Sequence, residues 1–344
     1  MSQLSEIHEF TGSGADRMPI KSHYTMKIKD FKKRYIQLNT IDLDSYNKSY
    51  FETYLEKINY NIYLGIHLLE NALPIEEYKQ IVDLGGGIGF NSALFAFLYP
   101  NKAVVYVDVD PVSAKSAELL NSQMGLTNIT YLVGGLEEHV DQLTNESLLC
   151  SRDVIEHIYN LETFFKQSSK AKTNVHNTAA VLNSWLRRNE FKRIHKMAEF
   201  EGNTAKSIKD RDSRKPYFNQ RIDIISKLRP DYSEEKLHEI TALTRGLISA
   251  DIKQYVVNGV LPNHHNKCLY SNTCDPNTGN WAERTLSKKD YQLYAGSIPL
   301  KFTYPEYNVA GARTVFKRVP LGIVNLFAAF TGKHEIQPSF SIVY

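Results

Sequence analysis

A run of glycines beside a carboxylate is the part of this sequence best suited to holding a small molecule. Residues 81–84 are apolar except for Asp83, and the chain then runs into Gly85-Gly86-Gly87-Ile88-Gly89 before a segment with helical spacing. Glycines adopt turns that other residues avoid, and they let the backbone come close to a ligand. The pattern predicts a ligand-binding turn between a strand and a helix, although a tight turn without a ligand has the same composition.

The spacing of these glycines separates two classes of cofactor. A dinucleotide-binding turn needs a glycine at position 90, where Phe90 would crowd the helix against the strand. The chain instead has the pattern D-x-G-x-G-x-G, formed by Asp83, Gly85, Gly87 and Gly89. An acid beside the turn can meet the ammonium group of S-adenosylmethionine (SAM), which carries no pyrophosphate. We therefore expect Asp83, Gly85 and Gly87 to bind SAM, and nicotinamide binding is a minor alternative.

A second carboxylate closes the next predicted strand. Residues 103–107 are mostly apolar, and Asp108 ends the run. An acid about 20 residues after a glycine turn can accept hydrogen bonds from both ribose hydroxyls of a nucleoside. Helix capping is the alternative role, but Asp110 stands directly before Pro111 and suits that role better. We assign the ribose to Asp108 and the cap to Asp110.

Two later segments also follow predicted strands and are expected to complete the cofactor site. Gly135 and Leu136 come after the third strand and are expected to lie against one face of the adenine, with Val109 on the other. Residues 148–158 place Ser151 and other polar groups at the carboxyl end of the fourth strand. Ligands bind at the carboxyl ends of strands in open α/β sheets.

Two histidines are candidates for a catalytic base. His157 lies in Asp153-Val154-Ile155-Glu156-His157 just after the fourth strand, and His176 is expected at the end of the fifth. Imidazole titrates near neutral pH and can accept a proton from a hydroxyl or ammonium group. A structural role, such as bracing the following helix, is the alternative for both.

The sequence contains no strong metal-binding motif. One polar group is close together along the chain, but the spacing of its two cysteines is not that of a zinc knuckle. We predict no metal ligands and interpret the segment as a polar substrate loop. Its members are His264, His265, Cys268, Cys274 and Asp275.

The elements that must position these residues follow from periodicity. Residues 78–169 alternate β-branched runs with amphipathic segments, as β-α-β units of a parallel sheet do. Apolar residues at helical spacing predict one long helix over residues 50–73. Further strands are expected at 80–84, 103–108, 129–133, 148–151, 173–176, 301–305 and 339–344, and helices at 90–98, 111–124, 161–168, 281–295 and within 310–330.

This rhythm divides the chain into four parts. Residues 1–49 are polar and predict an N-terminal arm or lid, or equally a loose tail. Residues 50–182 predict the cofactor-binding core, residues 183–280 a helical insertion over the acceptor, and residues 281–344 the completion of the sheet. No internal repeat is visible.

Composition is that of a globular protein, with 42% hydrophobic and 23% charged residues in 344. A net charge of +3 is too small to imply a nucleic-acid partner. Three cysteines cannot form a disulfide framework, and the polar N-terminus lacks a signal-peptide pattern, so we expect a cytoplasmic protein. Residues 319–332 are shorter than the about 20 residues of a membrane span, and we expect a buried helix there.

Residues 187–215 are rich in Lys and Arg, with Glu and Asp interleaved. Such a run is typical of a solvated helix face. The functional alternative is a cationic wall for a phosphorylated acceptor.

On the glycine turn and its two acids, the chain resembles the class I SAM-dependent methyltransferases. Residues 83–89 are similar to the first motif of that family, Asp108 to its acidic residue, and residues 151–158 to its segment after the fourth strand. Residues 338–344 resemble its last strand. The resemblance implies an α/β fold with a Rossmann-like, seven-stranded, mostly parallel sheet and an antiparallel last strand, to which this chain adds a mainly helical insertion.

Two departures from the family pattern concern the acceptor and the adenine. Gly135 stands where the third motif usually has an acid, so backbone groups must recognise the adenine. About ninety residues follow the fifth strand, where the family usually has a short loop. Residues 275–284 resemble a bacterial subgroup with a long helical insertion, often linked to cell-surface carbohydrate pathways.

The resemblance implies an enzyme that transfers a methyl group from SAM to a small polar acceptor by in-line displacement. A sugar, a nucleotide-sugar or another phosphorylated metabolite fits the cationic segment. Two alternatives remain open from the residues. One is methylation of RNA or protein through residues 187–215, and the other is a non-catalytic, partner-binding module of the same fold.

Overall fold

Strands from both ends of the chain form one sheet in the computed structural model, which describes residues 22–72, 74–182, 187–202, 215–262, 271–306, 315–331, 337 and 339–344. They are β1 (Gln80–Leu84), β2 (Ala103–Asp108), β3 (Ile129–Val133), β4 (Ser147–Arg152), β5 (Thr173–Thr178), β6 (Lys301–Thr303) and β7 (Phe340–Val343). The seven described strands follow the order β3-β2-β1-β4-β5-β7-β6, in which β7 runs antiparallel to β5 and β6 and the other neighbouring pairs are parallel. The predicted α/β fold is confirmed.

The strand order reverses between β1 and β4. From β1 the chain adds β2 and β3 on one side, and it then returns to pair β4 with the other side of β1. In open α/β sheets, such a reversal creates a crevice at the carboxyl ends of the strands, where ligands bind. The glycine turn and the segment after β4 both start at this crevice.

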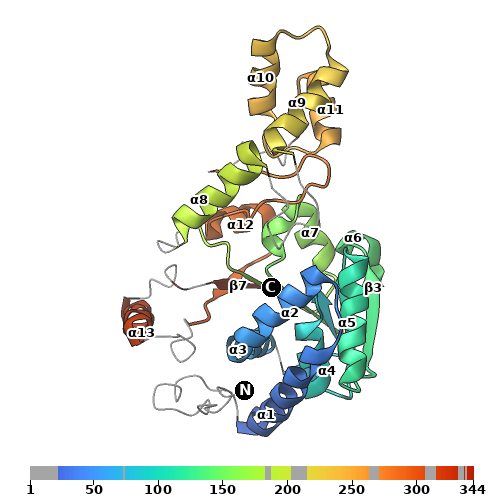
Figure 1. Ribbon diagram of the computed structural model, residues 1–344, viewed down its shortest axis with the longest axis vertical. Helices are drawn as coiled ribbons and strands as arrows, with labels where there is room; N and C mark the ends of the chain where they lie inside the picture. Colours follow the sequence, from blue (N-terminus) through green and yellow to red (C-terminus); the bar gives the residue numbers. More distant parts are fainter. Residues whose placement is uncertain are drawn as a thin grey trace.

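Helices cover both faces of the sheet (Figure 1). The face with Ile81 and Leu148 is covered by α1 (Ser22–Gln37), α3 (Ile58–Glu70), α4 (Phe90–Leu98) and α5 (Pro111–Gln123). The face with Val82 and Leu149 is covered by α6 (Leu136–His139), α7 (Leu161–Ser168) and α12 (Lys288–Ala295). Successive strand residues point to opposite faces, so the central strands are apolar on both.

The long helix predicted for residues 50–73 is wrong. Two helices, α2 (Ser45–Glu56) and α3, meet at Lys57, whose backbone (φ −114°, ψ 25°) is not helical. Asn47 on α2 donates a hydrogen bond to Ser116 of α5 at 3.0 Å, whereas α3 packs on α4 and β5. The apolar spacing continues through Lys57, and only these different packing partners divide the segment.

Part of the predicted N-terminal arm lies in the hydrophobic core. On α1, Phe31 and Tyr35 are fully buried, and their rings meet Phe90 edge-on at 5.7 and 4.9 Å between centroids. Aromatic pairs in this geometry add to the stabilisation from burial. Residues 1–21 lie outside the described residues, so the lid role of the arm stays a prediction.

The region predicted as a helical insertion is mainly helical where the structure describes it, with loops at residues 229–233, 244–248 and 271–280. Its helices are α8 (Arg188–Lys196), a π-helical turn η5 (Met197–Glu201), α9 (Tyr217–Leu228), α10 (Glu234–Leu243) and α11 (Ser249–Asn258). Helices α9, α10 and α11 enclose a small apolar core around Ile225, Leu247 and Ile252, and they lie far from the sheet along the long axis (Figure 1).

A buried ion pair anchors α9 to the π-helical turn. The Arg221 guanidinium and the Glu199 carboxylate are almost inaccessible to solvent, and they meet at 2.5 Å. Thr273 donates to the same carboxylate at 2.6 Å. Buried charges are tolerated when they are paired and hydrogen-bonded.

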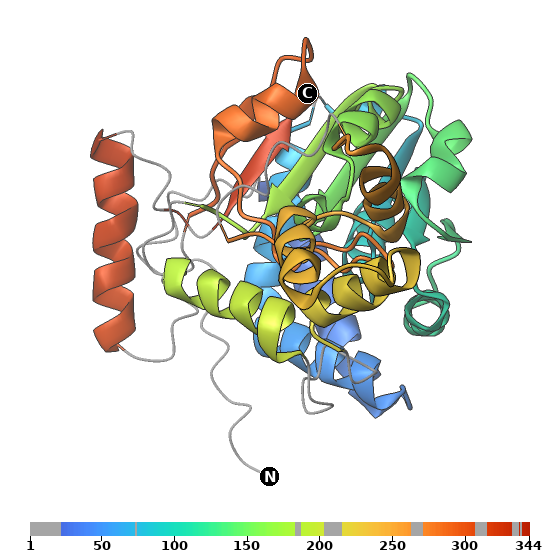
Figure 2. The ribbon, with the colours of Figure 1, turned by 90° about the horizontal axis from the view of Figure 1, so that it is seen from above.

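The helix expected to be buried near the C-terminus is exposed on one face. It is α13 (Val315–Thr331), on which Ile323, Phe327 and Phe330 are 60%, 48% and 87% exposed. The helix stands to one side of the sheet and its covering helices (Figure 2). Apolar composition predicted burial, but little of the described chain packs on this face. Among the described helices, none combines the length and apolar character needed to cross a membrane.

The Arg221–Glu199 pair predicts a large stability difference between two arginine substitutions. Arg221→Met leaves the Glu199 carboxylate buried without its cation, and we expect the free energy of unfolding to fall by about 3–5 kcal/mol. Arg229→Met is the control, since the Arg229–Asp231 pair is exposed and should contribute little. Urea unfolding of the variants measures both effects, and equal losses would contradict a special role for the buried pair.

Candidate active site

The glycine turn between β1 and α4 is open at one residue. Gly85, Gly87 and Gly89 have φ values of +66°, +52° and +76°, in the region that favours glycine. A Cβ on Gly85 would lie 2.2 Å from a methyl carbon of Val154. A Cβ on Gly87 would meet no heavy atom of the described chain within 4 Å. Packing therefore requires glycine at position 85, whereas Gly87 borders space that a ligand can occupy.

The Asp108 carboxylate joins this turn to the end of β2. Oδ2 accepts the backbone N–H of Gly87 at 2.8 Å, and Oδ1 accepts that of Asp110 at 2.9 Å. The hydroxyl of Tyr106 donates to the carbonyl oxygen of Gly87 at 2.7 Å. Carboxylate oxygens can each accept more than one hydrogen bond, so ribose hydroxyls can be added to these contacts. Asp110 caps α5 as predicted, accepting from Val112 and Ser113.

Asp83 lies beneath the turn and is 1% exposed. Its Oδ2 accepts a hydrogen bond from Ser92 Oγ at 2.6 Å, whereas Oδ1 has no hydrogen-bond partner among the described residues. Burial raises the pKa of Asp83 to about 6, against the opposing effect of the hydrogen bonds with Ser92 and with a smaller contribution from the charge of Asp108. A cationic or N–H donor near Oδ1 would stabilise the ionised form.

The three residues predicted for the adenine have different surroundings. Val109 follows Asp108 and is 72% exposed, so its side chain is accessible to a ligand. Gly135 begins α6, and its N–H is bonded to Glu138 at 2.9 Å. Leu136 is buried in the apolar cluster beneath the sheet. The segment therefore offers mainly backbone to a ligand, and Leu136 belongs to the core.

Ser151 and His176 lie together on the opposite face of the sheet from Asp83. Both side chains are fully buried, and Ser151 Oγ is 2.8 Å from His176 Nδ1. His176 Nε2 is 3.1 Å from the hydroxyl of Tyr344, so both ring nitrogens are occupied. Burial lowers the pKa of His176 to about 3. This environment suits a neutral structural histidine better than a base that reaches a substrate.

The residue after Ser151 carries a cation that the sequence analysis missed. Arg152 ends β4 on the same face as Asp83, and its guanidinium lies 5.4 Å from the Tyr54 ring centre. It donates to Asn61 Oδ1 at 2.8 Å and lies 3.5 Å from the Asp153 carboxylate. Its position directly after the fourth strand is the pattern that could have singled it out.

His157 belongs to a cluster of ionisable groups after β4. Ligand atoms of Glu156, His157 and Glu283 all lie within 4.8 Å of one another. Asp153 and Glu283 both have φ near +54°, a backbone conformation that is costly for residues other than glycine. The sequence pattern identifies His157 as a candidate but does not predict that Glu283 lies beside it, because the two residues are distant in the chain.

The predicted polar substrate loop is only partly described by the structure. Three of its members lie outside the described residues: His264, His265 and Cys268. Cys274 is buried, and Asp275 Oδ1 accepts the N–H of Asn277 at 2.8 Å in a turn. The described half of the segment therefore forms a hydrogen-bonded turn.

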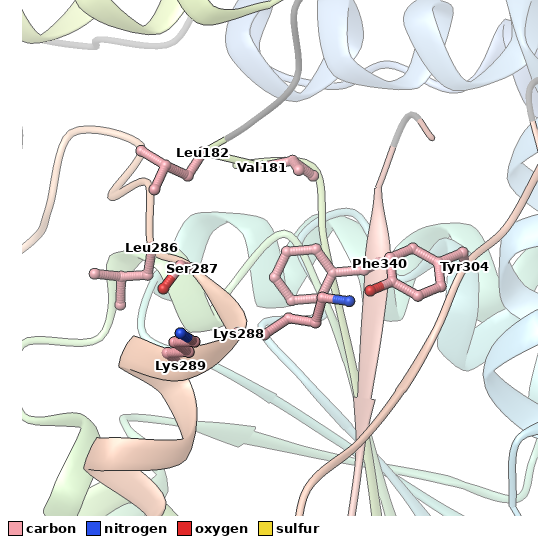
Figure 3. Close-up of a pocket in the computed structure, with 8 residues that line it drawn as sticks. All are labelled: Val181, Leu182, Leu286, Ser287, Lys288, Lys289, Tyr304 and Phe340. Atoms are coloured by element: carbon pink, nitrogen blue, oxygen red, sulfur yellow. The ribbon is translucent and has the colours of Figure 1, made fainter. Parts of the chain in front are cut away.

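A cavity of about 460 Å³ lies beside the carboxyl end of β5. Figure 3 shows the Lys288 side chain extending toward the rings of Tyr304 and Phe340, and its ammonium lies 5.1 Å from the Tyr304 ring centre. Leu286 and Val181 supply apolar walls. Lys288 is five residues from Glu283, so one segment of the chain connects the cavity to the cluster of Glu156, His157 and Glu283.

No family model matches the sequence, and no curated protein matches it. Solved structures that match part of the chain include several that are named methyltransferases. A precorrin-6y C5,15-methyltransferase from Geobacter metallireducens has 17% identity over 37% of this chain and 67% of its own, with a TM-score of 0.29. A putative sarcosine dimethylglycine methyltransferase from Galdieria sulphuraria has 20% identity over 34% and 44%, with a TM-score of 0.30.

A third is a geranyl diphosphate C-methyltransferase from Streptomyces coelicolor, which was solved with S-adenosylhomocysteine (SAH). It has 13% identity over 33% of this chain and 44% of its own, with a TM-score of 0.30. The chain thus spans less than half the length of two of these structures. The matches are partial and distant, and the function must be argued from the site itself.

The environment of His176 predicts a pH-dependent stability. The unfolded chain binds a proton near pH 6.5, whereas the folded chain binds it only near pH 3. Below about pH 6 the unfolded state therefore holds one more proton, and stability falls with decreasing pH by about 1.4 kcal/mol per unit from this group. Urea unfolding between pH 4 and 6 should show a shallower pH slope for His176→Asn than for the wild type. Parallel slopes would contradict a buried neutral His176.

Proposed function

We propose that this protein is a SAM-dependent methyltransferase. The observation that carries the proposal is the double attachment of Asp108, which holds the open glycine at position 87 next to the end of β2. This arrangement lies where the strand order reverses, so it offers a nucleoside both a close backbone approach and a carboxylate for its ribose.

The neighbouring residues suit the other parts of the cofactor. Asp83 Oδ1 needs a donor, and an ammonium group would supply one. The Arg152 guanidinium lies on the same face of the sheet and can pair with a carboxylate. These two opposite charges match the amino-acid end of SAM. The exposed Val109 and the backbone at Gly135 are proposed to flank the adenine.

Methyl transfer from SAM needs an aligned acceptor and, for a hydroxyl or ammonium acceptor, a place for its proton. We assign proton acceptance to the cluster of Glu156, His157 and Glu283 after β4. His176 is not included, because both of its ring nitrogens are bonded within the core. When bound, SAM supplies the methyl group and the leaving sulfur.

We propose a small polar acceptor in the cavity beside β5. Its aromatic walls suit a sugar or base face, and Lys288 suits a phosphate or another anionic group. The alternative, an RNA or protein acceptor bound through residues 187–215, gains no support from the described part of that segment. There, Arg187, Lys196 and Lys215 pair with Glu190, Glu201 and Asp223.

Asp108→Ala should weaken SAH binding at least about tenfold, since each hydrogen bond to a charged group contributes about 1.5–3 kcal/mol. Isothermal titration calorimetry measures the affinity. Asp110→Ala is the matched control: it removes only the cap of α5, costs about 1 kcal/mol of stability, and should leave SAH affinity unchanged. No SAH binding by the wild type, or equal losses in both variants, would remove the proposed ribose site.

The class of acceptor is tested by incubating the protein and SAM with either the small-molecule or the macromolecular fraction of a cell extract. We expect SAH to form with the small-molecule fraction and not with the macromolecular one. Lys288→Gln should reduce the rate at low acceptor concentration, because the cavity loses its cation. SAH formation only with macromolecules would contradict the small acceptor, and SAH formation with neither fraction would favour a non-catalytic module.

A further inference from the structure

We propose that Glu156, His157 and Glu283 form a binding site for a divalent metal ion of the Mn²⁺ class. Each residue offers one ligand atom, and all three atoms lie within 4.8 Å of one another. Ligand atoms around one ion at about 2.1 Å must lie within about 4.2 Å of one another, so small side-chain movements close the site. Two carboxylates and an imidazole suit Mn²⁺ and its neighbours in the first transition series.

Glu156 is the residue that most needs such a ligand. Its side chain is fully buried, and neither carboxylate oxygen has a hydrogen-bond partner among the described residues. A buried carboxylate is stable only if a proton or a cation compensates it.

No cation among the residues that the structure describes fills this role. Arg284, whose backbone N–H bonds to the carbonyl of Glu156 at 3.3 Å, is the cationic residue joined to this segment. Its guanidinium lies 4.2 Å from the Trp281 ring centre and donates to the hydroxyl of Tyr294 at 2.6 Å. Among the described residues, Glu156 forms no ion pair with it or with any other side chain.

His157 is oriented as metal-binding histidines are. Its Nδ1 lies 2.7 Å from the carbonyl oxygen of Trp281. A carbonyl can only accept, so Nδ1 carries the proton and Nε2 keeps its lone pair in the neutral ring. Metal-ligating histidines typically donate their other N–H to a carbonyl or carboxylate in this way.

The same contact fixes the third ligand. Trp281 is two residues before Glu283, and its N–H approaches the carbonyl of His157 at 3.4 Å. Backbone hydrogen bonds thus join residues 156–157 to residues 281–284, and all three ligand side chains stand on two paired segments. Pairing of this kind pre-organises a metal site.

The site follows β4 at the carboxyl edge of the sheet. If the proposed methyl transfer is correct, a bound ion would replace direct proton acceptance by these three side chains: it would hold an acceptor oxygen and lower the pKa of its hydroxyl, so that the proton can leave to water. This role depends on the proposed function, whereas ion binding itself does not.

Mn²⁺ titration of the metal-free, full-length protein tests the site, with free Mn²⁺ followed by electron paramagnetic resonance. We expect one Mn²⁺ per chain, and an affinity at least about tenfold lower for Glu156→Gln and for Glu283→Gln. Glu162→Gln is the matched control, since Glu162 is exposed on α7 nearby. It should bind Mn²⁺ as the wild type does.

Thermal unfolding gives a second measurement that does not depend on activity. Metal-free Glu156→Gln should be at least as stable as the wild type, because the buried charge is gone. Mn²⁺ should raise the midpoint of the wild type and of Glu162→Gln but not that of Glu156→Gln. Absence of Mn²⁺ binding by the wild type, or equal binding by all variants, would overturn the proposal.

SAH calorimetry on the same wild-type sample separates this proposal from the function. SAH binding without Mn²⁺ binding would remove the metal site and leave the methyltransferase proposal intact. Mn²⁺ binding that is lost in both site variants, in a protein that ignores SAH, would support the ion site and remove the assigned reaction.

Discussion

The site depends on one carboxylate that holds two backbone N–H groups. Asp108 accepts from Gly87 and from Asp110, and so it connects the turn after β1 to the turn after β2. The N–H groups of Gly85 and Gly86 add bonds to the carbonyl of Val107 at 2.7 and 3.2 Å. Because the two turns lie at the reversal of strand order, this small network sets the floor of the crevice. Glycine is conformationally permissive, and these hydrogen bonds hold the turn in one arrangement.

The alternation of side chains along β4 divides the predicted site in two. Cys150 and Arg152 point to the face of Asp83, whereas Ser151 points to the opposite face with His176. A period of two residues is a property of every strand, so neighbours in sequence cannot share a face. The cation next to the proposed cofactor is therefore Arg152, whereas Ser151 is hydrogen-bonded to His176, whose ring contacts Phe164 of α7 and Tyr344. This alternation ends with the strand. Glu156 and His157 follow β4, so both can direct their ligand atoms toward the same place.

Buried charge is treated differently in the two halves of the molecule. In the helical region, Arg221 and Thr273 compensate the Glu199 carboxylate, and these two partners explain how it can be buried. After β4, Glu156 is just as buried, but the described chain provides it with no such partners. The cost of burying a carboxylate is therefore compensated by protein groups at Glu199, whereas the described chain does not compensate it at Glu156. An uncompensated carboxylate at the ligand-binding edge of a sheet is the kind of group that marks a functional site.

Local patterns in the sequence determined the strands and their adjoining turns. The bounds of β1, β2, β3, α4 and α7 agree with the prediction, because apolar runs, glycines and caps such as Asp110 before Pro111 act within a few residues. Tertiary structure alone decided the break at Lys57, the exposed face of α13 and the burial of His176, since each depends on what packs against it. It alone brought Glu283 to Glu156 and His157, because backbone pairing between segments so far apart in the chain leaves no periodic trace in either of them.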